Sequence, residues 1–124
     1  MIRLLASALF ASFLALASCA SSPNAMKENA ITHHVAPDDL AYVQTKQAIP
    51  AKSATLYVNG LGCPLCASNI DKQLARVSGV EVKNIDLSTG KVAVHFTGDK
   101  HPAPFNLAHA VEDAGFTLVK IESN

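Results

Sequence analysis

Two cysteines separated by two residues have the clearest chemical potential in the sequence. They are Cys63 and Cys66, within the segment 60–66, which reads GLGCPLC. A C-x-x-C turn brings two sulfur atoms to one point. A helix that starts there offers free N–H groups and a positive dipole end, which favour thiolate over thiol. Two converging thiolates suit a soft cation, Cu(I) above all, whereas a zinc site prefers four ligands and this motif supplies two.

The hydrophobic pattern predicts the elements that must position this segment. After residue 54 the pattern alternates between the strand period and the helix period, in the order strand, helix, strand, strand, helix, strand. The six predicted elements cover residues 55–58, 66–77, 82–87, 91–96, 105–114 and 116–121. This order is typical of a ferredoxin-like α+β fold, in which two helices cover one face of a four-stranded antiparallel sheet. The cysteine pair then lies where the first strand gives way to the first helix.

Residues 1–18 have the pattern of a secretory signal peptide. One early positive charge, Arg3, is followed by a short apolar stretch that ends in small residues. The stretch is shorter than the roughly 20 apolar residues of a transmembrane helix. Residues 16–19 (LASC) resemble the bacterial lipobox, which implies that Cys19 receives a diacylglyceryl group and becomes the mature N-terminus. An ordinary cleaved signal followed by a chance cysteine is the alternative.

Lipidation of Cys19 would place the protein in the bacterial cell envelope, attached to a membrane by its N-terminal lipid anchor. Ala20 follows the cysteine where Asp would indicate retention at the inner membrane, so the outer membrane, facing the periplasm, is favoured. Residues 19–53 are rich in turn formers and interrupted by prolines. We therefore expect this part of the chain to be a flexible, lipid-anchored tether with one short helix over residues 38–47.

The adjacent His33 and His34 are the one chemically suggestive feature of the expected tether. Imidazole is a copper-compatible ligand, and so is the thioether of Met26 a few residues upstream. Adjacent histidines in a polar linker are more often simply solvated, so both interpretations stay open.

Composition and length exclude several classes of protein. The 124 residues allow one ordinary domain and leave no room for a two-domain enzyme. Ten Lys and Arg residues balance ten Asp and Glu residues, which gives no electrostatic case for nucleic acid as a partner. The sequence contains no nucleophile–base pattern and no phosphate-binding loop, so we do not expect an enzyme.

From about residue 54 to residue 122 the sequence resembles a heavy-metal-associated domain, the module of copper chaperones, copper-ATPase N-terminal repeats and the periplasmic mercury-binding protein. The family motif, G-M-[T/x]-C-x-x-C, is matched by residues 60–66. Supporting matches follow the predicted first helix, lie in the predicted hairpin and precede the last strand: VSGV at 77–80, IDL at 85–87, TGK at 89–91 and EDAGF at 112–116. The chain then divides into a signal peptide (1–18), a tether (19–53) and a heavy-metal-associated domain (54–124).

The resemblance implies that Cys63 and Cys66 are the metal ligands, with Cu(I) as the expected metal and Hg(II) or Zn(II) as further candidates. It implies a partner that is a metal-transporting ATPase or another metal-binding domain. A loop shielding the metal is expected from Leu61, Gly62, Pro64 and Phe116. Two residues depart from the family pattern. Leu61 replaces a methionine that packs into the core, and Gly62 replaces a threonine, which should loosen the loop.

Two other functions of the same domain remain open. An exported C-x-x-C pair can form a disulfide or catalyse thiol–disulfide exchange. Thioredoxin-like oxidoreductases, however, place this motif in a longer α/β domain, and nothing downstream supplies the rest of one. The second alternative is a degenerate domain that serves protein contacts.

Overall fold

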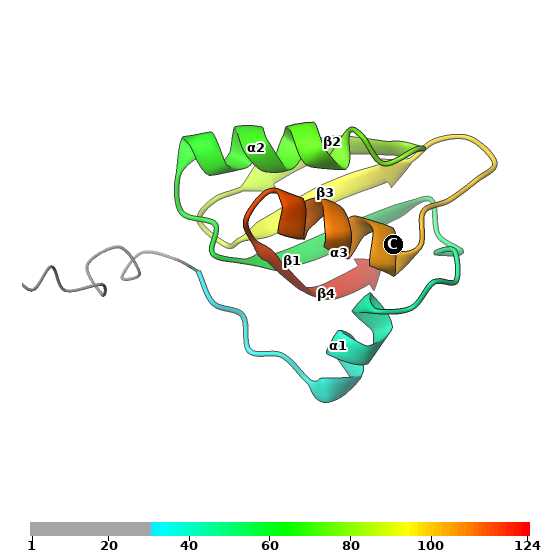
Figure 1. The fold of residues 1–124 in the computed structure, drawn as a ribbon, viewed down its shortest axis with the longest axis horizontal. Coiled ribbons are helices and arrows are strands. Elements are labelled where there is room, and N and C mark those ends of the chain that lie inside the picture. The colour runs from blue at the N-terminus through cyan, green and yellow to red at the C-terminus, as the bar shows by residue number, and fades with distance from the viewer. Residues whose placement is uncertain (1–30) are drawn as a thin grey trace, which may run out of the picture.

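The computed structural model of the protein describes residues 31–124. The predicted signal peptide, Cys19 and Met26 lie outside these residues. Within them the chain forms three helices and four strands (Figure 1). In chain order they are α1 (Pro37–Val43), β1 (Ser53–Asn59), α2 (Pro64–Leu74), β2 (Val80–Asp86), β3 (Lys91–Phe96), α3 (Pro104–Asp113) and β4 (Thr117–Ser123).

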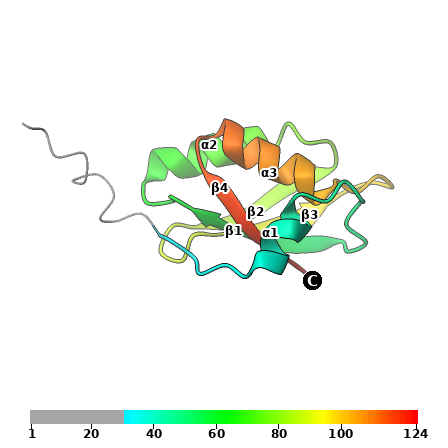
Figure 2. The same ribbon diagram turned by 60° about the horizontal axis from the view of Figure 1, so that its bottom comes forward.

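The four strands form one antiparallel sheet in the order β2-β3-β1-β4. Helices α2 and α3 lie side by side on one face of this sheet (Figures 1 and 2). From β1 onward the element order is β-α-β-β-α-β, so the predicted ferredoxin-like α+β fold is confirmed.

The core lies between the sheet and the two helices. Because side chains alternate across a strand, every second residue of β1 and β3 is buried while its neighbours stay partly or fully exposed. The helices add one apolar stripe each. The buried residues of these four elements include Ala54, Leu56, Val58, Val92, Val94, Phe96, Ile70, Leu74, Leu107 and Val111. Since β1 is central and ends at Asn59, the core holds in place the strand that leads into the cysteine loop.

Residues 31–52, the described part of the chain before β1, belong to the folded domain, so the expectation of a flexible tether is wrong for these residues. Val43 and Ile49 are each only 1% exposed and belong to the same hydrophobic core as the sheet. Helix α1 packs beside β4 and α3 (Figure 2). Backbone hydrogen bonds join Ile49 N–H to the Pro102 carbonyl at 3.0 Å and Phe105 N–H to the Thr45 carbonyl at 3.0 Å. The sequence indicated a linker because its turn formers are frequent, whereas Val43 and Ile49 are too far apart to show a helix or strand period.

The short helix expected over residues 38–47 is present but begins and ends earlier. Pro37 occupies its first turn, where a missing N–H costs no hydrogen bond, and the N-cap is Ala36 rather than an aspartate. The helix ends at Val43, which is buried, whereas Leu40 is 46% exposed. No helix within residues 31–124 is long and apolar enough to cross a membrane.

Candidate metal site

The loop between β1 and α2 places both cysteines in the first turn of α2. Cys63 is the N-cap, with extended backbone angles (φ −140°, ψ 153°), and Pro64 follows in the first turn. The N–H of Cys66 lies 3.3 Å from Cys63 Sγ, and the N–H groups of Cys66 and Ala67 lie 3.1 and 3.3 Å from the Cys63 carbonyl. The Cys66 N–H is thus shared between the Cys63 carbonyl and Cys63 Sγ, and one sulfur lies against an N–H group at the positive end of the helix.

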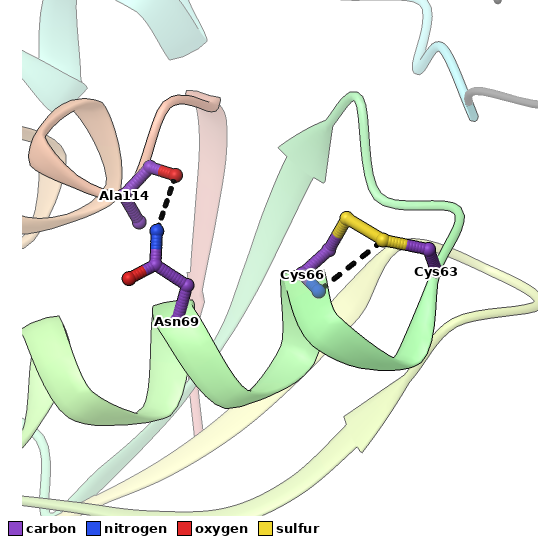
Figure 3. The surroundings of a disulfide bond; sticks show 4 residues. All are labelled: Cys63, Cys66, Asn69 and Ala114. Atoms are coloured by element: carbon purple, nitrogen blue, oxygen red, sulfur yellow. Dashed lines mark hydrogen bonds between the residues drawn. A yellow bond between two sulfur atoms is a disulfide. The ribbon is translucent and has the colours of Figure 1, made fainter.

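The two sulfur atoms are joined in a disulfide, with the Cα atoms 5.2 Å apart (Figure 3). Both cysteines are half-buried, so the pair lies at the surface with one side open to solvent. The first turn of α2 contains no acidic residue, so no carboxylate within that turn opposes the negative charge of a thiolate. In the reduced state this turn could hold two thiolates close enough to bind one metal ion.

The residues expected to shield the site occupy different environments. Leu61 is fully buried in the hydrophobic core, as expected for a residue that stands where the family has a core methionine. Phe116 is half-buried against the start of the loop, since a Cβ atom on Gly60 would lie 3.2 Å from its Cδ1. Gly60 has φ +95°, a conformation that favours glycine. Gly62 and Pro64, in contrast, are exposed.

Two further side chains near the cysteines were not singled out by the sequence. Leu65, between the cysteines, is 82% exposed and is the most exposed large apolar side chain among residues 31–124. Asn69 donates a hydrogen bond from Nδ2 to the Ala114 carbonyl at 2.8 Å (Figure 3). This bond ties α2 to the turn that leads to Phe116. No sequence signal predicts it, because the two residues are 45 positions apart.

The structure brings no histidine into a metal site among the residues that it describes. No group of three or more His, Cys, Asp or Glu side chains within residues 31–124 could hold a metal ion. His33 contacts Asn59 and Gly90, and His34 is exposed. The ring nitrogen Nδ1 of His101 lies 2.9 Å from the Ile49 carbonyl, and that of His109 lies 3.1 Å from Asp113 Oδ2.

The hairpin turn after β2 contains the most perturbed carboxyl group in the described part of the chain. Asp86 accepts hydrogen bonds from the hydroxyls of Ser88 and Thr89 and from the Ser88 N–H. These bonds stabilise the ionised form and lower the pKa of Asp86 from 3.8 to about 2. The turn ends at Gly90, whose carbonyl accepts from the Val58 N–H at 2.9 Å, so it is joined to the strand that leads into the cysteine loop.

Comparison with known proteins finds matches over the part of the chain that contains the cysteine loop. Residues 55–117 match the family model of the heavy-metal-associated domain. The copper chaperone CopZ of Bacillus subtilis (strain 168) is 33% identical over 66 residues, which are 53% of this chain and 94% of the chaperone. The copper-transporting ATPase 2 of Rhizobium meliloti (strain 1021) is 30% identical over 77 residues, which are 61% of this chain but only 9% of that ATPase.

Among solved structures, the N-terminal domain of PacS from Synechocystis is similar, with 29% sequence identity and a TM-score of 0.47. The alignment covers 55% of this chain and 94% of that domain. The match to the family model runs from β1 through the cysteine loop, α2, β2, β3 and α3 to the first residue of β4. The chain therefore belongs to the heavy-metal-associated domain family.

Proposed function

We propose that the protein binds Cu(I) through the reduced thiolates of Cys63 and Cys66 and passes the ion to another protein. The observation that carries this proposal is the position of both sulfurs in one helical turn, with the Cys66 N–H against Cys63 Sγ and no carboxylate in that turn. The names of the matched relatives, a copper chaperone and a copper-transporting ATPase, support copper as the metal.

The choice of metal follows from the number of ligands. Cu(I) is a soft ion that two thiolates suit, and Hg(II) is the next candidate for the same reason. Zn(II) prefers four ligands, and no third His, Cys, Asp or Glu side chain joins the cysteines in residues 31–124. We therefore rank Zn(II) third.

Metal transfer would proceed by ligand exchange. An incoming thiolate of the partner adds to Cu(I), and one of the two cysteines leaves and takes up a proton. The second cysteine then leaves in the same way. Leu65, which is 82% exposed between the two ligands, offers an apolar contact beside the exchanging sulfurs. A metal-transporting ATPase or a second metal-binding domain is the partner that we propose.

The disulfide must first be opened by a reductant. Two electrons and two protons from a dithiol or a pair of small thiols convert the bond to two thiols, while the donor is oxidised to its own disulfide. Metal binding then releases the thiol protons. The observed disulfide also favours a second candidate function, thiol–disulfide exchange by the same pair. That alternative predicts insulin reductase activity and a reduction potential close to those of catalytic dithiols.

We propose in addition that the protein is held in the bacterial cell envelope by lipid on Cys19. The described chain begins at Ile31, which contacts the cysteine loop, so the anchor and the metal site would lie near the same end of the domain. The twelve residue steps from Cys19 to Ile31 reach at most about 40 Å. The anchored domain could therefore meet a partner that lies within this distance of the membrane surface.

A titration of the mature chain with Cys19 replaced by serine tests the metal assignment. The reduced protein competes with a chromogenic chelator for Cu(I), and one equivalent is expected to be retained. The variant with both Cys63→Ser and Cys66→Ser is expected to retain none. Ser68→Ala, an exposed change one turn later in α2, is the matched control and should behave as the parent. Equal copper retention by the double variant would sink the assignment.

A further inference from the structure

Residues 31–35, here called the strap, precede the part of the chain that matches the family model, which begins at residue 55. The strap runs alongside the cysteine loop at the end of the domain where β1 gives way to α2 (Figure 1). Its contacts with this loop differ from those of α1 and Ile49, which pack at the β4 edge and in the core.

The strap supplies hydrogen bonds that the sheet does not provide. The ladder between β1 and β3 ends at Tyr57, and the ladder between β1 and β4 ends at Asn59. Beyond both, the Gly60 N–H donates to the Ile31 carbonyl at 3.0 Å, and the Ile31 N–H donates to the Leu61 carbonyl at 3.4 Å. One strap residue thus pairs with two consecutive loop residues, three and two positions before Cys63.

His33 holds the strap in this place through both its backbone and its ring. Its N–H donates to Asn59 Oδ1 at 2.7 Å, and its Nε2 lies 3.3 Å from the Gly90 carbonyl. The ring also packs edge-on against Tyr57, with the ring centroids 5.2 Å apart. His33 therefore joins the end of β1 to the hairpin turn before β3.

Gly90 shows how closely the strap is seated. A Cβ atom at this position would lie 2.8 Å from both His33 Nε2 and the Val58 carbonyl oxygen, and 3.0 Å from Ile31 Cγ2. Real Cβ contacts are almost never so short, so a larger residue here would be crowded by the strap on one side and by the β1 backbone on the other. Glycine at the end of the turn after β2 therefore suits both the backbone conformation (φ +65°) and the close approach of the strap.

The loop needs such support because two of its residues are glycines. Gly60 and Gly62 flank Leu61, and glycine has the greatest backbone freedom of any residue. The buried Leu61 side chain anchors the loop from below. The strap holds the backbone on either side of the Gly60–Leu61 peptide.

We propose that the strap positions the metal-binding loop, with Asn59 and His33 as positioning residues, and that it slows ligand exchange at Cys63. When the strap is released, the loop opens more often and the first cysteine becomes more accessible to an incoming thiol. The metal part of this inference rests on the proposed function. The effect on the loop and on thiol reactivity does not.

The test uses the mature full chain with Cys19→Ser and compares Asn59→Ala with Asn59→Asp, which keeps the acceptor oxygen. Asn124→Ala is the matched control, because Asn124 also bonds a β1 residue, donating to Thr55 Oγ1 at 3.2 Å at the other end of the strand. Three rates are measured: amide exchange of Gly60, alkylation of the reduced cysteines by a neutral reagent, and transfer of Cu(I) to a chelator.

Asn59→Ala is expected to raise all three rates by about twofold to tenfold, the range that corresponds to one net hydrogen bond. Asn59→Asp should return the three rates to those of the parent. Asn124→Ala should leave the rates unchanged, although it should lower the melting temperature about as much as Asn59→Ala does. His33→Ala should act as Asn59→Ala does and provides the test if Asn59→Ala fails to fold. Its control is His95→Ala, because His95 is also half-buried but lies in β3 opposite Ser53, at the start of β1.

Unchanged Gly60 exchange and alkylation in Asn59→Ala, or an equal change in Asn124→Ala, would overturn the role of the strap. A protein that binds no Cu(I) in any variant would instead refute the proposed function. In that case the exchange and alkylation rates still decide whether the strap positions the loop.

Discussion

Replacing Ile49 by alanine is expected to destabilise the whole domain, although this residue precedes the part that matches the family model. Its side chain is 1% exposed and belongs to the hydrophobic core. The substitution removes three carbon atoms, whose transfer from water contributes about 2.4 kcal/mol at 0.8 kcal/mol per group. The cavity left behind adds to this, so the free energy of unfolding should fall by about 2–5 kcal/mol.

The measurement is thermal and urea unfolding of the mature chain, followed by circular dichroism. For a domain of this size each kcal/mol lowers the melting temperature by about 4–8 °C, so a drop of roughly 8–40 °C is expected. Leu40→Ala is the matched control, because Leu40 lies in the same segment and is 46% exposed. Its effect should stay within about 1 kcal/mol.

An equal effect of the two substitutions would refute the reasoning. It would mean that the segment before β1 adds nothing to the core and is the flexible tether that its composition indicates. A large effect of Ile49→Ala alone would instead extend the folded unit well before residue 55.

Three further predictions concern the loop, a turn and the anchor. Leu61→Met should cost less than about 1.5 kcal/mol and Leu61→Ala about 2–5 kcal/mol, since Leu61 is fully buried; urea unfolding measures both. Because the pKa of Asp86 is lowered to about 2, its contribution to stability is complete above pH 4 and lost as the pH falls through 2. Melting curves should therefore show a smaller loss between pH 4 and 2 for Asp86→Ala than for the parent. Labelling of growing bacteria with a fatty acid should mark the parent and Cys63→Ser but not Cys19→Ser; a labelled Cys19→Ser protein would refute the anchor.

The core of the fold was predictable because its signals are local. Alternating burial in β1 and β3 appears in the sequence as a period of two, and the apolar stripe of α2 appears as a period near four. The start of α2 is encoded within four residues, since Pro64 suits a first turn and Cys63 precedes it as the N-cap. The position of the cysteine pair followed from the same signals.

The second half of the expected tether was not predictable in this way. Val43 and Ile49 are isolated apolar residues that become core only because α3 and β4 offer them a surface. The sequence leaves His33 open as a copper ligand or a solvated side chain, but it packs against Tyr57 and bonds Asn59. These contacts join residues 24 to 26 positions apart, which no local period records.

The sequence by itself thus determined the order of strands and helices from β1 onward, the family, and the two cysteines at the start of α2, because each depends on neighbouring residues. Only the tertiary structure decided that residues 31–53 belong to the domain, that Asn69 ties α2 to the turn before Phe116, and that the strap holds the cysteine loop. The physical reason is that these contacts need surfaces and unpaired backbone groups that exist only once the sheet has formed.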